Sequence, residues 1–307
     1  MKNKIVITSG KKYIDIDAFG GIFAYRKLLR NLGYDAYAVT TAKLNESIPE
    51  VIKEMNFQFD EKVELTDHIK FIILDVSNPD FFDTFVKREN IIEIIDHHTG
   101  YEKCWSHTNI KAQIEFIGSI CTILFEKIVE AKKEELLDQD LCKVLIAGIL
   151  DNTLNLKSSN TTKRDRYAYQ ELLKIGKINK DWSKIYFHSC YGEMEKNLEE
   201  SIINDIKVEK TSSLLPEVFG QLIVLQKDTI LHNIDKVLAV FSEYEEWIFN
   251  VISLEDGKSY LFYSSSLVKE KLSLLFHQPN SDSYFILNKC MLRKEIIKLA
   301  KEQEEKV

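Results

Sequence analysis

Short apolar runs alternate with longer amphipathic segments through the first half of the chain. The apolar runs are rich in β-branched and aromatic residues and are expected to form β-strands: residues 5–7, 36–40, 71–74 and 91–95. Nearly continuous apolar character is typical of strands covered on both faces of a parallel sheet. The segment 18–32 repeats apolar residues every three or four positions and is followed by Gly33, which indicates a helix with a glycine at its carboxyl end. The alternation predicts an α/β domain in which helices cover both faces of a parallel sheet.

The pattern changes near residue 180, which divides the chain into two expected domains. Before that point, further helices are expected at 118–130, at 134–150 and after a capping box that runs from Thr162 to Asp165. We predict a first domain at 1–180, a linker at 181–196 and a second domain at 197–307. The second domain is expected to be a smaller mixed α/β fold with these elements: helices at 197–206, 266–276 and 291–301, strands at 221–226, 247–254 and 259–263, and a hairpin turn at 255–258.

Composition narrows the class of protein. The chain has 307 residues, of which 45% are hydrophobic and 29% are charged, as is ordinary for a globular protein. This composition excludes a mainly disordered chain. The net charge of −7 argues against a long nucleic acid held by overall attraction. No apolar stretch approaches the ~18–20 residues of a membrane span, and the amino terminus has no secretory signal, so a cytoplasmic location is expected. The five cysteines form no CxxC pair, which disfavours a thiolate zinc site.

Acidic and imidazole side chains follow the predicted strands and one long helix. They fall at four places: Asp15 with Asp17, Asp75, Asp96 with His97 and His98, and Asp151 with Asn152. The carboxyl ends of parallel strands meet at one edge of a sheet, where ligands bind. Carboxylates and neutral imidazoles suit Mn²⁺ or Mg²⁺, and two such ions ~3.5–4 Å apart can serve phosphoryl transfer. A single aspartate at a strand end is also a common turn former or helix cap, so the coincidence of four places is what favours a metal site.

Four segments in this order resemble the motifs of the DHH phosphoesterase superfamily: Asp15 to Ala18, Asp75, Asp96 to His98, and Ala147 to Ser158. The second half resembles the DHHA2 domain of family II, manganese-dependent inorganic pyrophosphatases and their exopolyphosphatase relatives. The segments that carry this second likeness are residues 221–226, residues 247–252 and the basic pair Arg293 and Lys294. The resemblance covers almost the whole chain and is stronger in the first half.

The resemblance implies a role for each matching residue of the first domain. The ligands of one metal ion would be Asp17, Asp75, His97 and Asp151. A second metal ion would be held by Asp15 and by Asp75, which both ions share. His98 would contact the substrate and assist the leaving group, while Asp96 would orient the imidazoles from behind.

Basic residues of the second domain match positions that grip phosphate oxygens in the family: Lys207, Arg293 and Lys294. The substrate would then lie in the cleft between the domains. A solvated helix face is the alternative interpretation for Arg293 and Lys294.

The chain departs from the family pattern at three places. Lys11 occupies the position of a metal-binding histidine, and an ammonium group cannot ligate a metal, so the second metal site should be weak. Lys11 would instead place a positive charge near a phosphate. The fourth motif aligns with either Asp151 or Asn152, and we favour Asp151 because a carboxylate is the better ligand. The segment 292–295 retains one cation fewer than the family's Ser-Arg-Lys-Lys.

These observations predict a metal-dependent phosphohydrolase that cleaves pyrophosphate or a short polyphosphate. Two other functions remain open: a phosphodiesterase for short oligonucleotides or cyclic dinucleotides, and a degenerate relative that binds a nucleotide or phosphate and regulates a partner. Mn²⁺ is the expected cofactor, with Mg²⁺ and Co²⁺ as alternatives. We expect a small phosphorylated substrate and neither a membrane nor a long nucleic acid as a partner. The sequence leaves the exact substrate open, and also whether the chain forms a homodimer.

Overall fold

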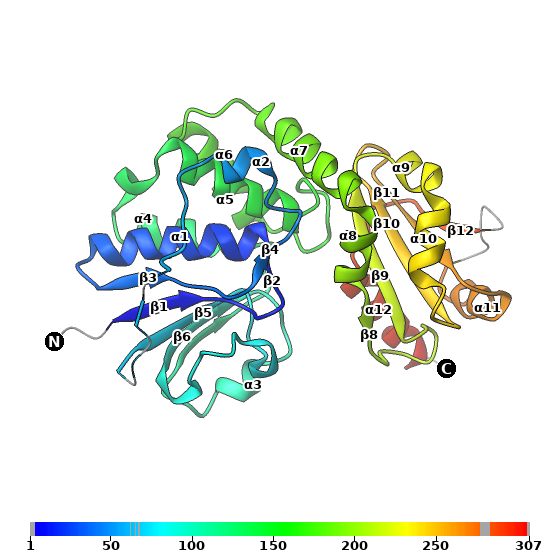
Figure 1. Ribbon diagram of the computed structural model, residues 1–307, viewed down its shortest axis with the longest axis horizontal. Helices are drawn as coiled ribbons and strands as arrows, with labels where there is room; N and C mark the ends of the chain where they lie inside the picture. The colour runs from blue at the N-terminus through cyan, green and yellow to red at the C-terminus, as the bar shows by residue number, and fades with distance from the viewer. Residues whose placement is uncertain (1–3, 62, 65, 67, 277–282, 306–307) are drawn as a thin grey trace. The chain divides into compact units, whose positions relative to one another are not determined.

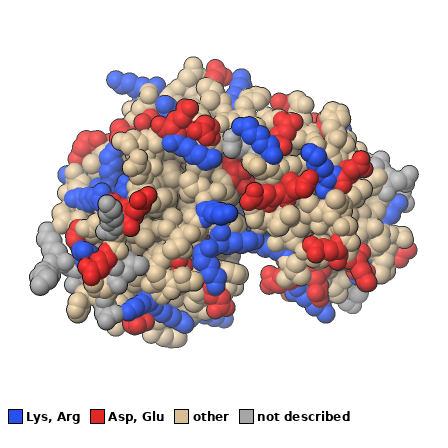
Figure 2. Space-filling model, viewed as in Figure 1, with Lys and Arg blue, Asp and Glu red and all other residues tan. Residues whose placement is uncertain are grey.

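The protein is described by a computed structural model, which covers residues 4–61, 63, 64, 66, 68–276 and 283–305. The chain forms two compact units. The N-terminal unit comprises Met1–Leu156 and Asn160–Cys190, and the C-terminal unit comprises Lys157–Ser159 and Tyr191–Val307. Figure 1 shows the elements of both units. Acidic and basic side chains both occur across the face drawn in Figure 2.

The N-terminal unit is built on a five-stranded parallel sheet. In chain order its strands are β1 (Ile5–Thr8), β3 (Ala36–Ala38), β5 (Lys70–Leu74), β6 (Ile91–Asp96) and β7 (Lys111–Ile114). In space the order is β3-β1-β5-β6-β7, and every neighbouring pair is parallel. The four strands expected from the apolar runs are confirmed. β7 was not expected, because its sequence Lys-Ala-Gln-Ile is largely polar, as is tolerated at the edge of a sheet. A separate pair joins β2 (Tyr13–Ile14) to β4 (Lys43–Leu44).

Helices complete the N-terminal unit. They are α1 (Ile16–Asn31), α2 (Glu50–Lys53), α3 (Glu102–Trp105), α4 (Ile120–Glu130), α5 (Gln139–Asn152), α6 (Lys163–Ile175) and α7 (Trp182–Lys196), with 3-10 turns η1 (Pro79–Phe81), η2 (Arg88–Asn90) and η3 (Glu134–Leu136). The helix expected at 134–150 is divided, because the Asp138 side chain accepts from Leu141 N and starts a new helix there. The capping box of Thr162 and Asp165 is confirmed, and Gly33 has the left-handed φ of 84° expected beyond a helix end.

The two faces of the parallel sheet are covered differently. Figure 1 shows α1 lying along one face, with α5 and α6 stacked beyond it, in agreement with the contacts of α1 to α5 and of α5 to α6. On the other face Val6, Phe71 and Ile73 pack with Phe82 and with Trp105 of α3. The hydrophobic side chains of the strands are therefore buried on both sides, as their continuous apolar runs predict.

The C-terminal unit is a mixed sheet with its own helices, as expected. Its strands are β8 (Lys207–Val208), β9 (Val218–Val224), β10 (Trp247–Ser253), β11 (Lys258–Tyr263) and β12 (Tyr284–Leu287), in the order β12-β11-β10-β9-β8. Only β9 and β10 are parallel among these pairs of described strands. Its helices are α8 (Leu198–Asp205), α9 (Asp228–His232), α10 (Ile234–Phe241), α11 (Ser266–Ser273) and α12 (Arg293–Glu304). The sequence analysis did not identify α9, α10, β8 or β12.

Alternate residues of β10 point into different cores of the C-terminal unit. Trp247, Phe249 and Val251 pack on one face of the sheet, while Ile248 packs on the other face with Phe285. The segment expected as a linker, residues 181–196, is almost entirely the helix α7, within which the chain passes from one unit to the other. Each helix of the described residues is too short or too polar to cross a bilayer.

Candidate metal centre

The carboxyl edge of the N-terminal sheet carries the candidate ligands. The strand order reverses between the neighbours β1 and β5, and in open α/β sheets ligands bind at such a switch point. Asp75 directly follows β5, and His97 and His98 follow β6. Asp15 caps the amino end of α1, where its Oδ1 accepts from Ala18 N at 2.9 Å. These side chains therefore all start from one edge of the sheet.

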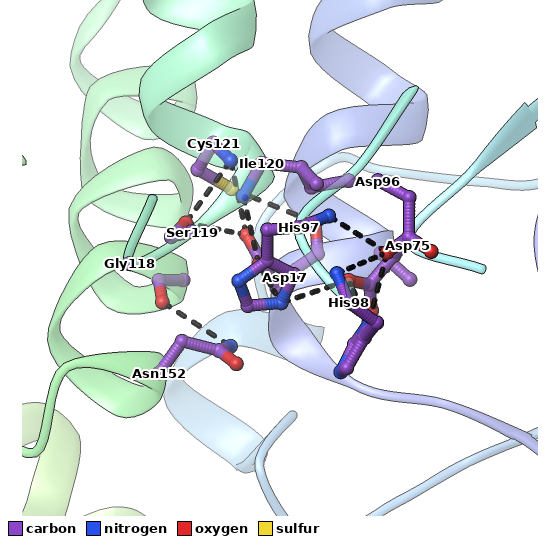
Figure 3. Close-up of polar contacts among 12 residues, drawn as sticks. Asp17, Asp75, Asp96, His97, His98, Gly118, Ser119, Ile120, Cys121 and Asn152 are labelled. Atoms are coloured by element: carbon purple, nitrogen blue, oxygen red, sulfur yellow. Dashed lines mark hydrogen bonds and ion pairs between the residues drawn. The ribbon is translucent and has the colours of Figure 1, made fainter. Parts of the chain in front are cut away.

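Two carboxylates meet the imidazole of His97. Its Nε2 lies 3.3 Å from Asp75 Oδ1 and 3.7 Å from Asp17 Oδ2, and Figure 3 shows these side chains facing one another. One ligand atom each from Asp75, His97 and His98 lie within 4.8 Å of one another. Carboxylate oxygens and an imidazole nitrogen at such separations form a donor set typical of borderline divalent cations. The residues present therefore fit a divalent metal ion.

A backbone carbonyl determines which nitrogen of His97 faces the carboxylates. His97 Nδ1 lies 3.1 Å from Ile117 O, and because a carbonyl oxygen only accepts, Nδ1 carries the proton and donates. The neutral ring then presents the lone pair of Nε2 to Asp75 and Asp17. Metal-binding histidines are commonly oriented in this way by a group behind them.

Asp17 is fully buried at the amino end of α4. Its Oδ1 accepts from Ser119 Oγ at 2.6 Å and from Cys121 N at 3.0 Å, and its Oδ2 accepts from Ile120 N at 3.0 Å. Burial raises the pKa of Asp17 to about 7, the charge of Asp15 adds to the rise, and the hydrogen bonds from Ser119 and Cys121 oppose it. The partly positive amino end of α4 thus orients the carboxylate of Asp17, whose charged form is destabilised by the neighbouring Asp15.

Asp96 organises the turn that carries the two histidines. Its Oδ1 accepts from the backbone N–H groups of His97 at 2.7 Å and His98 at 3.0 Å, and it lies 2.8 Å from His98 Nδ1. Burial by itself would raise the pKa of Asp96, but the hydrogen bond and the charge of His98 hold it at about 2. Because a carboxylate only accepts, His98 donates through Nδ1. The His98 side chain is 52% exposed, which leaves its Nε2 for an incoming molecule.

Asp15 and Asp151 are two further acidic groups near this cluster, and both have raised pKa values. Burial raises the pKa of Asp151 to about 7, the charge of Asp15 adds to the rise, a hydrogen bond from Tyr186 opposes it, and the charge of Asp17 adds a smaller rise. Burial also raises the pKa of Asp15. Acidic groups that are buried together favour their neutral forms until a cation compensates them.

A close approach of α5 brings its carboxyl end to the site. A Cβ atom on Gly148 would lie 2.5 Å from Cys121 Sγ and 3.2 Å from Asp17 Oδ1, so this packing requires glycine. Asp151 and Asn152 follow three and four residues later, on the same side of the helix. Their side chains have different partners: Asp151 Oδ1 accepts from Tyr186 OH at 3.0 Å, whereas Asn152 Nδ2 contacts Gly148 O at 3.5 Å.

Left-handed backbone occurs at two points beside the site. Asp75 has a φ of 62° and donates its N–H to Ile95 O at 2.8 Å, which anchors it to β6. Immediately beyond α5, Leu154, Asn155 and Leu156 have φ values of 50°, 56° and 62°. Side chains with a Cβ pay about 1–2 kcal/mol for this conformation, and such residues cluster at functional sites.

The structure separates the predicted site residues into two groups. Those at the carboxyl edge of the N-terminal sheet are Asp15, Asp17, Asp75, Asp96, His97 and His98, and Asp151 near the end of α5 is close enough for the charges of Asp15 and Asp17 to raise its pKa. The predicted phosphate-binding residues Lys207, Arg293 and Lys294 lie in the C-terminal unit, where Lys207 and Lys294 are exposed. Lys11 is exposed in the N-terminal unit, and its backbone N–H donates to Phe81 O at 2.9 Å.

Arg293 has its partners inside the C-terminal unit, which favours a structural role over the expected binding of phosphate. It is buried, and its Nη1 donates to Asp205 O at 2.7 Å and to Phe219 O at 2.6 Å. Its Nη2 lies 3.1 Å and 3.0 Å from the two carboxylate oxygens of Asp205. These partners occupy the terminal N–H groups of the guanidinium. The sequence alone does not indicate which of the two adjacent residues, Arg293 or Lys294, faces the interior. In the structure Arg293 is buried and Lys294 is exposed.

The sequence analysis did not assign three supporting residues to the site: Ile117, Ser119 and Tyr186. Ser119 precedes an apolar run, which is a recognisable position for a helix cap, but its partner Asp17 lies 102 residues away. Tyr186 falls in the expected linker and carries no local signal. Contacts over such separations require the folded chain.

Known proteins resemble this chain in sequence and in fold. Residues 4–149 match the model of the DHH family, N-terminal domain. A protein named probable manganese-dependent inorganic pyrophosphatase from Streptococcus thermophilus is 25% identical over 291 residues, covering 90% of this chain and 87% of the relative. A protein of the same name from Lactobacillus gasseri is 23% identical over 300 residues, covering 93% and 94%.

Two solved structures share the fold of the whole chain. A putative family II inorganic pyrophosphatase from Methanococcus jannaschii superposes with a TM-score of 0.71 at 19% identity and covers 97% of this chain and 99% of its own. An exopolyphosphatase-related protein from Bacteroides fragilis gives a TM-score of 0.53 at 16% identity and covers 99% and 92%. With the DHH match and the cluster at the sheet edge, these likenesses lead to one conclusion: residues 4–149 are similar to the N-terminal domain of the DHH family, and the chain shares the fold of these two solved structures.

Proposed function

We propose that this protein is a metal-dependent phosphohydrolase that cleaves a phosphoanhydride, pyrophosphate or a short polyphosphate. One observation carries the proposal: two carboxylate oxygens face the Nε2 of His97, Asp75 Oδ1 at 3.3 Å and Asp17 Oδ2 at 3.7 Å. The names of the relatives, manganese-dependent inorganic pyrophosphatases, support the substrate class.

Asp17, Asp75 and His97 would hold the metal ion, with Asp151 completing the set and Asp15 contributing to a weaker second site. Mn²⁺ suits these mixed nitrogen and oxygen donors and agrees with the names of the relatives, and Mg²⁺ or Co²⁺ are the alternatives. When bound, the metal polarises phosphoryl oxygens and lowers the pKa of a water molecule. Ser119, Ile117 and Asp96 fix the ligands in place before the ion arrives.

His98 is suited to protonate the leaving phosphate. Asp96 accepts from His98 Nδ1, which aims the opposite nitrogen, Nε2, away from Asp96 and toward a substrate. A proton held on Nε2 can pass to the bridging oxygen as the phosphoanhydride bond breaks. Acid catalysis by a positioned side chain contributes typically ~10²–10⁴-fold.

Positive charge for the substrate's oxygens would come from Lys207, Lys294 and Lys11, which are exposed. Arg293 is not part of this set, because its guanidinium is used inside the C-terminal unit. The set holds fewer cations than the family pattern, which favours a substrate with modest charge density, so pyrophosphate and tripolyphosphate should be compared directly.

The test is a metal and phosphate-release assay on the purified full chain. Bound metal per chain is determined, and phosphate release is followed with Mn²⁺, Mg²⁺ and Co²⁺ on pyrophosphate, tripolyphosphate and a dinucleotide. His98→Ala should lower kcat about 10²–10⁴-fold with metal content unchanged, whereas His188→Ala, which removes an exposed histidine from α7, should have no effect. Turnover of the dinucleotide alone would identify a phosphodiesterase, and bound metal without any turnover would identify a binding protein.

A further inference from the structure

Tyr186 of α7 makes a polar contact at the edge of the metal centre. Its ring is completely buried, and its hydroxyl lies 3.0 Å from Asp151 Oδ1 and 2.9 Å from Ser47 O. Both partners are acceptors, so the single phenolic proton is shared between a candidate metal ligand and a backbone carbonyl. Phenylalanine would fill the same space, so the hydroxyl is present for these contacts and not for packing.

Ser47 connects this contact to the start of α1. Its Oγ accepts from Ile16 N at 2.9 Å and donates to Asn45 Oδ1 at 2.6 Å. Ile16 stands between Asp15 and Asp17. Tyr186 and Ser47 therefore link the end of α5, which carries Asp151, to the start of α1, which carries Asp15 and Asp17.

The next turn of α7 continues the contact with Ser47. Cys190 lies four residues after Tyr186, and its Sγ is 3.9 Å from Ser47 O. Two positions on one face of α7 thus approach the same carbonyl. The Tyr186 hydroxyl is therefore carried by a helix, and it meets a carbonyl of the turn that contains Ser47.

We infer that Tyr186 is a positioning residue of the metal centre: its hydroxyl holds Asp151 through Oδ1 and leaves the other carboxylate oxygen to the cation. The inference rests on the proposed metal-dependent function. A carboxylate that is held in one rotamer loses less freedom when it binds a metal ion than one that rotates. Groups that orient ligands from behind typically change metal affinity about 10–100-fold when they are removed.

The test is titration of the metal-free full chain with Mn²⁺ by calorimetry. Tyr186→Phe should weaken Mn²⁺ binding about 10–100-fold. Its kcat/KM should fall at limiting Mn²⁺ and recover at saturating Mn²⁺, because the chemistry at His98 is untouched. Tyr191→Phe is the matched control, since it removes a hydroxyl of the same helix that lies 2.6 Å from Thr229 Oγ1 in the C-terminal unit, and it should leave the affinity unchanged.

A double substitution separates positioning from general destabilisation. In the Asp151→Ala background, Tyr186→Phe should have no further effect on Mn²⁺ affinity, because Tyr186 acts through Asp151. Equal affinity of the wild type and Tyr186→Phe, or an equal loss in both backgrounds, would overturn the inference. A wild-type protein that binds Mn²⁺ without hydrolysing any phosphoanhydride would contradict the proposed function alone and leave the affinity comparison valid.

Discussion

The two units differ in the partners of their buried charged groups: Asp17 in the N-terminal unit has an acidic neighbour, whereas Arg293 in the C-terminal unit has an oppositely charged partner. In the N-terminal unit the carboxylate of Asp17 accepts from the uncharged donors of Ser119, Ile120 and Cys121, and burial together with the acidic neighbour Asp15 raises its pKa. In the C-terminal unit the guanidinium of Arg293 is bonded to the carboxylate of Asp205 and to two carbonyls. A buried charge that its partners neutralise belongs to the scaffold, whereas buried like charges indicate a place for a counterion.

The largest expected effect is on the stability of the C-terminal unit. Arg293→Ala removes the buried ion-pair partner of Asp205 and should cost up to roughly 3 kcal/mol, because the half-buried carboxylate then loses its opposite charge. Lys294→Ala is the neighbouring control, and as an exposed substitution it should stay within about 0.5 kcal/mol. Urea unfolding measures both. An Arg293→Ala protein of unchanged midpoint but much weaker substrate binding would return Arg293 to the substrate site.

The next effect is a pH dependence of the metal-free N-terminal unit. Asp17 and Asp151 have folded pKa values raised to about 7 from an ordinary value of 3.8. Between these values the native state holds protons that the unfolded chain has released, so the stabilisation is complete below about pH 4 and is lost as pH rises through about 7. Asp96, with its pKa lowered to about 2, contributes no change in that window.

Thermal unfolding in a chelator should therefore show Tm falling between pH 5 and pH 8. Saturating Mn²⁺ should reduce the fall, because the cation favours the charged carboxylates. Asp151→Asn should also make the metal-free Tm less dependent on pH, because the amide side chain does not bind or release a proton in this range. A metal-free Tm that rises over this range would show that the carboxylates do not share a buried site.

The smallest effect concerns Lys11, which is an exposed residue of the N-terminal unit. If its ammonium attracts a substrate phosphate, Lys11→Met should raise KM with kcat unchanged, by up to about 5-fold, since exposed charges contribute about 1 kcal/mol or less. The increase should shrink at high salt. An unchanged KM at low salt would mean that Lys11 plays no part in binding.

Local patterns in the sequence predicted much of the framework. The strands β1, β5 and β6 follow from buried apolar runs, and α1 follows from its three- and four-residue spacing. Strand β7 and helix α9 were not predicted, because a polar edge strand and a five-residue helix carry weak periodicity. The division of the helix at 134–150 depended on one cap, Asp138, within an otherwise helical pattern.

The sequence by itself determined which residue types stand at the ends of the strands, because strand and helix periods are local and place Asp75 and His97 at the carboxyl edge of a parallel sheet. Only the tertiary structure decided what each charge meets. It placed Arg293 on Asp205, the amino end of α4 on Asp17, and Tyr186 on Asp151. The physical reason is that a buried charge is defined by its partners, and these partners are brought together by packing between elements that are distant in the chain.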